Sequence, residues 1–306
     1  MKLSIIGYKN HAIRLGKLLG GMGYDNIFYF NHHSDSDSDI EDSDMFFICS
    51  PNETHMNWID RLARFDKYIF CEKPPVSNYE ELNKIKDYRE KLYFNFNYRF
   101  SFLANQLEAY NRNDELGSPI YINCISTHGI AFKDSFQENW RFNNNNLLSS
   151  IIGNLGIHYV DFLSYIFGPI TDIDLDYLSI VSSELPDTCK MTLNLENCFS
   201  DILLSYAAPF ENKVMVIYEN GIVELSNGTV TVSGPRETFD ENGLFAVPSS
   251  ETLKKYNNSK DYYDDSLIKS LKYFLSCAEE NNSLSKNMYE KSIQSNKLLF
   301  DLVNSK

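Results

Sequence analysis

Hydrophobic and polar positions follow two alternating patterns over the first hundred residues. Short apolar runs typical of buried strands alternate with stretches whose apolar residues recur three and four apart, as in amphipathic helices. The pattern predicts strands at residues 2–7, 26–30, 45–51, 68–74 and 92–100, and helices at residues 11–23, 55–65 and 78–91. Strands that alternate with helices indicate a parallel sheet covered on both faces. We therefore predict an α/β domain over residues 1–117.

The pattern changes after residues 115–119. Runs rich in β-branched and aromatic residues then follow one another, with Asn220-Gly221 and Asn227-Gly228 placed as tight hairpin turns. They predict strands at 120–127, 189–196, 201–208, 213–220, 221–227 and 228–234. Amphipathic stretches predict helices at 157–167, 265–280 and 285–303. We predict a second, α+β domain over residues 118–306, with a mainly antiparallel sheet.

Composition and charge narrow the class of partner. The chain has 306 residues, 43% of them hydrophobic, and a formal net charge of −14. A field of this sign repels phosphate backbones and anionic membranes, so we expect neither nucleic acid nor a membrane as a partner. No apolar stretch approaches the roughly 20 residues that span a bilayer, and Met1 leads directly into a strand pattern. We expect a cytoplasmic protein.

The six cysteines, at positions 49, 71, 124, 189, 198 and 277, form no C-x-x-C motif. Most lie in apolar runs, where cysteine behaves as a small hydrophobic residue. We therefore expect no disulfides and no metal site.

The first predicted strand leads into "IIGYKNHA" (residues 5–12), which has the outline of a dinucleotide-binding turn. Gly7, Lys9 and Ala12 occupy the three fingerprint positions, and a pyrophosphate there would rest on the helix N-terminus near Asn10. Lys9 places a side chain where glycine usually allows close approach. An ordinary strand-to-helix turn is the alternative interpretation.

Asn31 follows the second predicted strand, where an acidic residue commonly bonds the ribose hydroxyls of NAD. An asparagine can still bond a hydroxyl, and the acidic run "SDSDSDIEDSD" that follows would repel a 2′-phosphate. We therefore predict NAD as the cofactor in preference to NADP.

Two further segments leave predicted strands at the edge where ligands gather in open α/β sheets. In "CSPNETH" (49–55), Pro51 and Asn52 could line a nicotinamide ribose, or the segment could be a plain loop with a helix cap. In "CEKPP" (71–75), Lys73 should project from the fourth strand next to Glu72. A lysine held beside a substrate could transfer protons, whereas the alternative is a surface lysine before a proline turn.

The predicted helix 157–167 carries a narrow polar stripe. His158, Asp161 and Tyr165 are spaced i, i+3 and i+7 among apolar neighbours. One interpretation is a buried histidine satisfied by the carboxylate three residues on. The other is a general acid or base with a pKa near neutrality.

Taken together, these motifs resemble the glucose-fructose oxidoreductase, inositol dehydrogenase and rhizopine catabolism (Gfo/Idh/MocA) family. The resemblance rests on "CEKPPV" after the fourth strand, "NYRF" (97–100), "NWRF" (139–142) and "GNLGIHYVD" (153–161), and it extends over nearly the whole chain. It implies a Rossmann domain, a second domain with an open antiparallel sheet, and a homo-oligomer, either dimer or tetramer.

The resemblance also implies an activity, namely hydride transfer between a nicotinamide cofactor and a hydroxyl or keto carbon of a sugar, cyclitol or nucleotide sugar. Lys73 and His158 would bind the reacting hydroxyl and move its proton. The cofactor would contact Gly7, Lys9, Asn10, Asn31, Ser50, Pro51, Asn52, His55, Glu72 and Lys73. The substrate would contact Tyr98, Arg99, Trp140, Arg141, Asn154 and His158.

One departure from the family pattern bears on catalysis. The usual aspartate four residues before the histidine is Asn154, which can bind a hydroxyl but cannot take its proton. Proton transfer would therefore fall to Lys73 and His158. The alternative function is a non-catalytic regulatory protein that binds a cofactor or sugar on the same scaffold.

Overall fold

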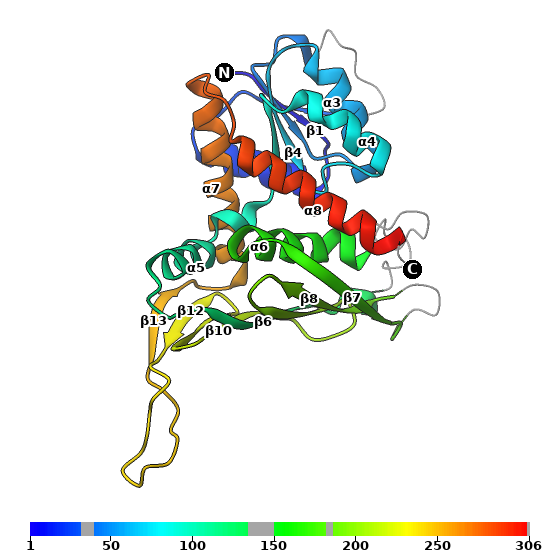
Figure 1. Ribbon diagram of the computed structural model, residues 1–306. Helices are drawn as coiled ribbons and strands as arrows, with labels where there is room; N and C mark the ends of the chain where they lie inside the picture. Colours follow the sequence, from blue (N-terminus) through cyan, green and yellow to red (C-terminus); the bar gives the residue numbers. More distant parts are fainter. Residues whose placement is uncertain (32–39, 134–149, 182–185, 305–306) are drawn as a thin grey trace. The chain divides into compact units, whose positions relative to one another are not determined.

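The computed structural model describes residues 1–31, 40–133, 150–181 and 186–304 (Figure 1). The chain forms two compact units, and each is described by itself below. Unit 1 contains residues 1–96 and 268–306, and unit 2 contains residues 97–267.

Unit 1 is built on a five-stranded parallel sheet with the order β2-β1-β3-β4-β5. Its strands are β1 (Leu3–Ile6), β2 (Ile27–Phe30), β3 (Met45–Ile48), β4 (Tyr68–Glu72) and β5 (Leu92–Asn95). Its helical segments are α1 (Asn10–Gly21), η1 (Asn52–Thr54), α3 (His55–Ala63), α4 (Tyr79–Lys84), η2 (Ile85–Tyr88) and α8 (Lys286–Asn304), together with the end of α7 (Ser259–Glu279).

The apolar strands explain why this sheet is covered. Every residue of β1 and β3 is buried, as expected for strands with helices on both faces. Phe274 of α7 makes edge contacts with the rings of Phe47 and Phe70, and α8 contacts β5 and α4. These contacts place the C-terminal residues in the core of unit 1, although they are distant in sequence.

Unit 2 contains an eight-stranded sheet with the order β13-β12-β11-β10-β6-β9-β8-β7. Neighbouring strands are antiparallel except β6 and β9, which are parallel. The strands are β6 (Pro119–Thr127), β7 (Ile170–Leu178), β8 (Thr188–Leu195), β9 (Phe199–Ser205), β10 (Glu211–Tyr218), β11 (Gly221–Ser226), β12 (Thr229–Ser233) and β13 (Ser250–Lys255). The helical segments are η3 (Asn97–Phe100), α5 (Phe102–Asn113), η4 (Ile130–Phe132), the π-helix η8 (Ile152–Gly156) and α6 (Ile157–Phe167), with the start of α7.

Alternation of buried and part-exposed residues runs along β10 and β11, so one face of the sheet supplies the core of unit 2. The turn between β11 and β12 uses Asn227 and Gly228 at φ 45° and 93°, as the sequence predicts. The other hairpin turn lies one residue earlier than expected. Gly221 already begins β11, where a Cβ would lie 2.8 Å from the Ser233 carbonyl oxygen.

The predicted fold class is confirmed, namely a Rossmann-like parallel sheet followed by a mainly antiparallel one. The helix predicted at 157–167 has those bounds in the structure, whereas the strand predicted at 92–100 ends at Asn95. The expected domain boundary near residue 117 stays a prediction, and the two compact units divide the chain after Phe96 and again before Ile268. Among the described residues, no helix is both long enough and apolar enough to span a bilayer.

Candidate functional site

The carboxyl ends of the parallel strands in unit 1 bring several of the predicted residues to one edge. Gly7 follows β1, Ser50 lies two residues after β3, Glu72 ends β4 and Asn95 ends β5. In open α/β sheets this edge is where ligands bind.

The turn after β1 has the features of an anion-binding loop. Gly7 has a φ of 129°, and a Cβ there would lie 2.9 Å from the Cys49 carbonyl oxygen, so only glycine fits. This loop leads into α1 at Asn10. The first turn of α1 carries no acidic residue, and Ala12 is buried. Lys9 has an extended backbone and an exposed side chain, so it causes no backbone strain at the second fingerprint position. These residues fit a pyrophosphate at the helix N-terminus.

The loop after β3 is fixed by side-chain hydrogen bonds. Thr54 Oγ1 donates to Ser50 Oγ at 2.7 Å, and Ser77 Oγ donates to the Asn52 carbonyl oxygen at 3.2 Å. Pro51 precedes η1, and its φ of −56° suits a position just before a helical turn. Asn31, which directly follows β2, is half-buried. The contacts of these residues with a cofactor remain a prediction.

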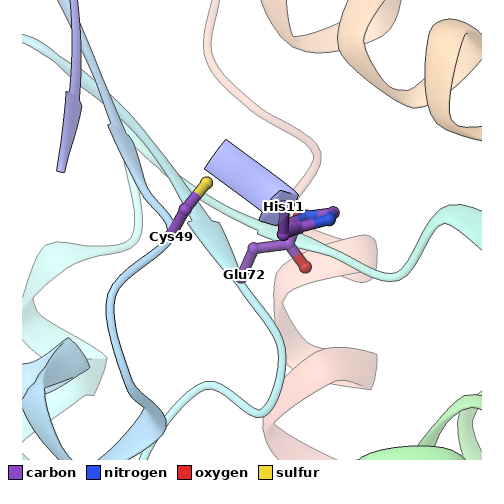
Figure 2. Close-up of side chains that lie close together, drawn as sticks. All are labelled: His11, Cys49 and Glu72. Atoms are coloured by element: carbon purple, nitrogen blue, oxygen red, sulfur yellow. The ribbon is translucent and has the colours of Figure 1, made fainter. Parts of the chain in front are cut away.

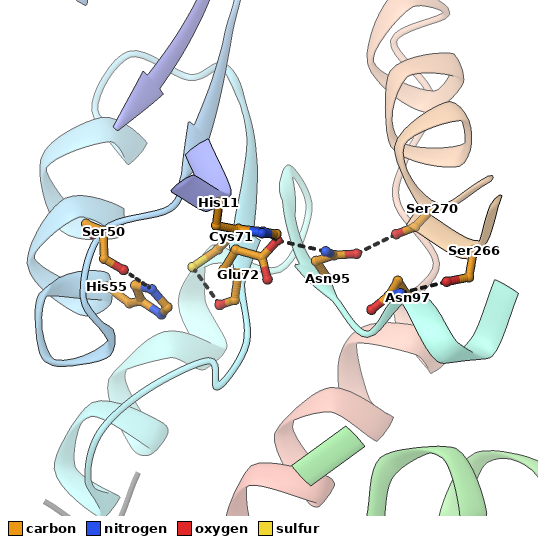
Figure 3. Close-up of polar contacts among 9 residues, drawn as sticks. All are labelled: His11, Ser50, His55, Cys71, Glu72, Asn95, Asn97, Ser266 and Ser270. Carbon is orange, nitrogen blue, oxygen red and sulfur yellow. Dashed lines mark hydrogen bonds and ion pairs between the residues drawn. The ribbon is translucent and has the colours of Figure 1, made fainter. Parts of the chain in front are cut away.

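His55 has a different environment from the one expected of a cofactor ligand. The side chain is fully buried, and Nδ1 lies 2.9 Å from the Pro74 carbonyl oxygen. Figure 3 shows the contact of the other ring nitrogen, Nε2, with the Ser50 carbonyl oxygen at 3.1 Å. Burial is the main cause that lowers its pKa. Because both ring nitrogens face backbone carbonyls, we assign His55 to holding the loops around Ser50 and Pro74 instead of touching the cofactor.

Glu72 is the centre of a hydrogen-bond network at the sheet edge (Figure 3). Its Oε1 accepts from His11 Nε2 at 2.7 Å and from Asn95 Nδ2 at 2.8 Å, while Ser270 Oγ donates to Asn95 Oδ1 at 2.8 Å. Burial by itself would raise the pKa of Glu72, but His11, Asn95 and the charge of Lys73 outweigh it and lower that pKa to about 2. The carboxylate is therefore ionised throughout the physiological range.

This shift predicts how stability depends on pH. A carboxyl with a lowered pKa in the folded state stabilises the protein above its unfolded pKa, and this contribution is lost as the pH falls through the folded value. We expect Glu72→Gln to lower the free energy of unfolding at pH 6 by an amount on the order of 3 kcal/mol. The difference from wild type should shrink between pH 5 and pH 2, because the Glu72 carboxyl binds a proton at a higher pH in the unfolded chain than in the folded protein. Urea denaturation at several pH values measures it.

Glu90→Gln is the matched control for this prediction, because Glu90 is exposed. It should change the free energy of unfolding little at any pH. A Glu72→Gln difference that stays constant from pH 6 to pH 3 would show that the network does not act through the charge of Glu72.

Lys73 follows Glu72 directly and is half-buried. Its charge contributes to the lowered pKa of Glu72, so the two charged groups influence one another. The next peptide bond, Lys73-Pro74, is cis, and the Pro74 carbonyl is bonded by His55. The backbone that carries Lys73 is thus held from both sides, by β4 before it and by His55 after it.

In unit 2, two predicted residues lie where the π-helix η8 passes into α6. Asn154 Nδ2 donates to the hydroxyl of Tyr206 at 2.7 Å, and that ring stacks on His128 with centroids 4.9 Å apart. His158, in the first turn of α6, stacks on Tyr98 with centroids 4.5 Å apart and planes 15° apart. Tyr98 in turn stacks on Tyr263. An aromatic stack therefore fixes the imidazole plane.

Asp161, which one of the two interpretations pairs with His158, binds Arg99 in the structure. The Asp161 carboxylate forms a bidentate ion pair with Arg99, whose Nε and Nη2 lie 2.9 Å and 2.5 Å from its two oxygens. Both side chains are 1% exposed, and the guanidinium also lies over the Tyr165 ring. Arg99 is consequently enclosed in unit 2, and we assign it to anchoring η3 to α6 in place of the expected contact with substrate.

Trp140 and Arg141, expected to contact the substrate, lie outside the described residues. The structure adds others that sequence reasoning did not single out, chiefly His11, Asn95 and Tyr206. Asn95 could have been found, because it follows an apolar run at the same sheet edge as Glu72. No sequence signal pairs His11 with a residue 61 positions away.

Two parts of the chain match the models of two protein domains. Residues 22–94 match the family described as oxidoreductase family, NAD-binding Rossmann fold, and residues 105–224 match the GFO/IDH/MocA C-terminal domain. A glucose-6-phosphate 3-dehydrogenase of Bacillus subtilis (strain 168) is 30% identical over 156 residues, or 49% of this chain. The match spans 42% of that relative, well under two thirds of its length.

Solved structures show the same fold over the whole chain. A myo-inositol dehydrogenase from Corynebacterium glutamicum aligns with a TM-score of 0.72 at 17% identity, covering 100% of this chain and 96% of that one. A levoglucosan dehydrogenase in complex with NADH aligns with a TM-score of 0.78 at 15% identity, with the same coverage. With both domain types matched, in the expected order and over more than half of the sequence, the chain belongs to the Gfo/Idh/MocA oxidoreductase family.

Proposed function

We propose that the protein is an NAD-dependent oxidoreductase acting on a hydroxyl or keto carbon of a sugar, cyclitol or nucleotide sugar. The observation that carries the proposal is the carboxyl edge of the unit 1 sheet. The Gly7 turn follows β1 there, and the Glu72-Lys73 pair lies at the end of β4, with β3 between the two strands. The relatives named above are dehydrogenases of glucose 6-phosphate, myo-inositol and levoglucosan, which supports this substrate class.

The cofactor would be held by the turn between β1 and α1. Gly7 admits the backbone close to a pyrophosphate, and the N-terminus of α1 favours its charge. When bound, NAD supplies the hydride acceptor or, in its reduced form, the donor. The preference over NADP rests on Asn31 and on the acidic residues that follow it in the sequence.

Proton transfer would fall to Lys73 and His158. Lys73 is held by the strand before it and by the Pro74 carbonyl bonded to His55, and His158 is held by stacking on Tyr98. Fixed groups of this kind raise the rate because no reorganisation precedes the proton transfer. Asn154 would bind a substrate hydroxyl, since its amide cannot accept a proton.

The test combines cofactor binding with turnover. NADH is titrated into the protein while the fluorescence of Trp58 and Trp140 is followed, and turnover is then measured against a panel of sugars, sugar phosphates, cyclitols and nucleotide sugars. We expect His158→Ala to lower kcat/KM by about 10²- to 10⁴-fold for the preferred substrate, with the Kd for NADH nearly unchanged.

A second outcome would assign the protein to the regulatory class. NADH would bind, but no compound in the panel would be oxidised or reduced by the wild-type protein. The Asn154→Asp variant, which has a carboxylate at this position, would then distinguish two causes of the missing turnover. It should gain turnover if only the catalytic base is absent, and it should stay inactive if the substrate site itself is absent.

Oligomeric state and location are also part of this proposal. Between β12 and β13, Phe239, Leu244, Phe245 and Val247 are exposed, the last two at 87% and 91%, as expected of a surface that another subunit covers. All six cysteines are thiols, as is common in the reducing cytoplasm. We propose a cytoplasmic homo-oligomer, and light scattering measures its mass.

A further inference from the structure

Three side chains with metal-binding atoms gather at the carboxyl edge of the unit 1 sheet (Figure 2). His11 lies in the first turn of α1, Cys49 directly follows β3, and Glu72 ends β4. One ligand atom from each lies within 4.8 Å of those of the other two, with His11 Nε2 2.7 Å from Glu72 Oε1. Each residue is half-buried, so the group is open to an ion from solvent.

The backbones that carry these ligands are fixed to one another. The Cys49 amide donates to the Ile6 carbonyl oxygen at 2.9 Å, and Ile48 is in register with both Ile6 and Cys71. A metal would therefore bridge elements that the sheet already holds close together, which lowers the entropy cost of forming a site.

Glu72 also has the supporting contacts found around metal ligands. Asn95 bonds its Oε1, and Ser270 in turn bonds Asn95. Such contacts orient a ligating carboxylate and typically contribute 10- to 100-fold to metal affinity.

We propose that His11, Cys49 and Glu72 form a binding site for a zinc-type divalent ion. Thiolate, imidazole and carboxylate together suit Zn²⁺, whereas Mg²⁺ and Ca²⁺ require oxygen ligands. One thiolate and one carboxylate neutralise the two charges of the ion, so the occupied site has no net charge to bury. Three protein ligands leave the fourth tetrahedral position to water.

Binding requires small rearrangements and one deprotonation. The His11 to Glu72 distance must widen to about 3.3 Å, because each atom would lie about 2.0 Å from a tetrahedral ion. The Cys49 thiol gives its proton to solvent, and His11 presents Nε2 to the metal with its remaining proton on Nδ1. No C-x-x-C spacing marks the site in the sequence, because its ligands come from three separate elements.

Cobalt provides the probe, because Co²⁺ replaces Zn²⁺ and absorbs light. Titration of the full, untagged chain under reducing conditions should produce a near-ultraviolet thiolate-to-cobalt band and the visible bands of tetrahedral cobalt. Zinc should displace the cobalt at one equivalent per chain. Cys49→Ser should abolish the thiolate band, and His11→Ala and Cys49→Ser should each weaken zinc binding by at least about 100-fold.

Cys277→Ser is the matched control, since Cys277 is another half-buried thiol and lies in α7. It should leave the cobalt spectrum unchanged, and the metal-free Tm of each variant shows that it folds. A wild-type titration without a thiolate band, or an equal band in Cys49→Ser, overturns the proposal. NADH titration without metal reports the cofactor site separately, so failure here can be distinguished from failure of the proposed function.

Discussion

Replacing Lys73 with methionine should lower kcat/KM by about 10³-fold, the magnitude expected when a positioned proton donor or acceptor is removed. Methionine keeps most of the side-chain length and removes the ammonium. The loss should appear mainly in kcat, because the interaction is strongest in the transition state. The Kd for NADH should change by less than about ten-fold, since the Gly7 turn is untouched. Steady-state kinetics and NADH fluorescence measure the two quantities.

Lys67→Met is the matched control for this prediction. Lys67 is exposed and immediately precedes β4, at the opposite end of the strand that leads to Lys73. It should leave kcat/KM within about two-fold of wild type. If Lys73→Met retains full turnover, the half-buried ammonium only balances the charge of Glu72, and the proposed proton transfer is wrong.

Replacing Arg99 with methionine should have the largest effect on stability. The change leaves the Asp161 carboxylate buried without its bidentate partner, since both side chains are 1% exposed. Removing one member of such a pair typically costs 3–5 kcal/mol, because the remaining charge is neither solvated nor paired. We expect Tm to fall by roughly 5–10 °C, measured by thermal unfolding.

Two variants test this explanation. Arg99→Met combined with Asp161→Leu should recover most of the lost stability, because neither charge then remains buried. Lys260→Met removes an exposed lysine from its pair with Asp264 and should lower the free energy of unfolding by less than about 1 kcal/mol. Equal losses in the Arg99 single variant and the double variant would mean that lost packing of Arg99, and not an unpaired charge, causes the effect.

Much of the fold could be predicted because local pattern and tertiary structure agree. The apolar periodicity of residues 157–167 marks α6, and Asn227-Gly228 marks a hairpin whose two residues have positive φ. The strand predicted at 92–100 ends at Asn95, because the chain passes into the helical turn η3 at Asn97. Aromatic residues continue from the strand into this turn, so the apolar pattern does not mark the boundary.

The candidate site could likewise be predicted from the sequence only in part. Glu72 and Lys73 could be placed at the sheet edge, because the strand before them ends there. The partners of charged side chains could not be predicted, since Glu72 bonds His11 61 residues away. Asp161 likewise pairs with Arg99, 62 residues away. Spacing predicts which residues share an element, but pairing depends on which elements pack together.

In the proposed function, Lys73 and His158 act on the same substrate hydroxyl. A double-mutant cycle on kcat/KM with Lys73→Met and His158→Ala tests it most directly. If the two groups serve one proton transfer, the double variant should be no more than a few-fold slower than the slower single variant. Losses that simply multiply in the double variant would mean that the two residues act independently, and would contradict the account.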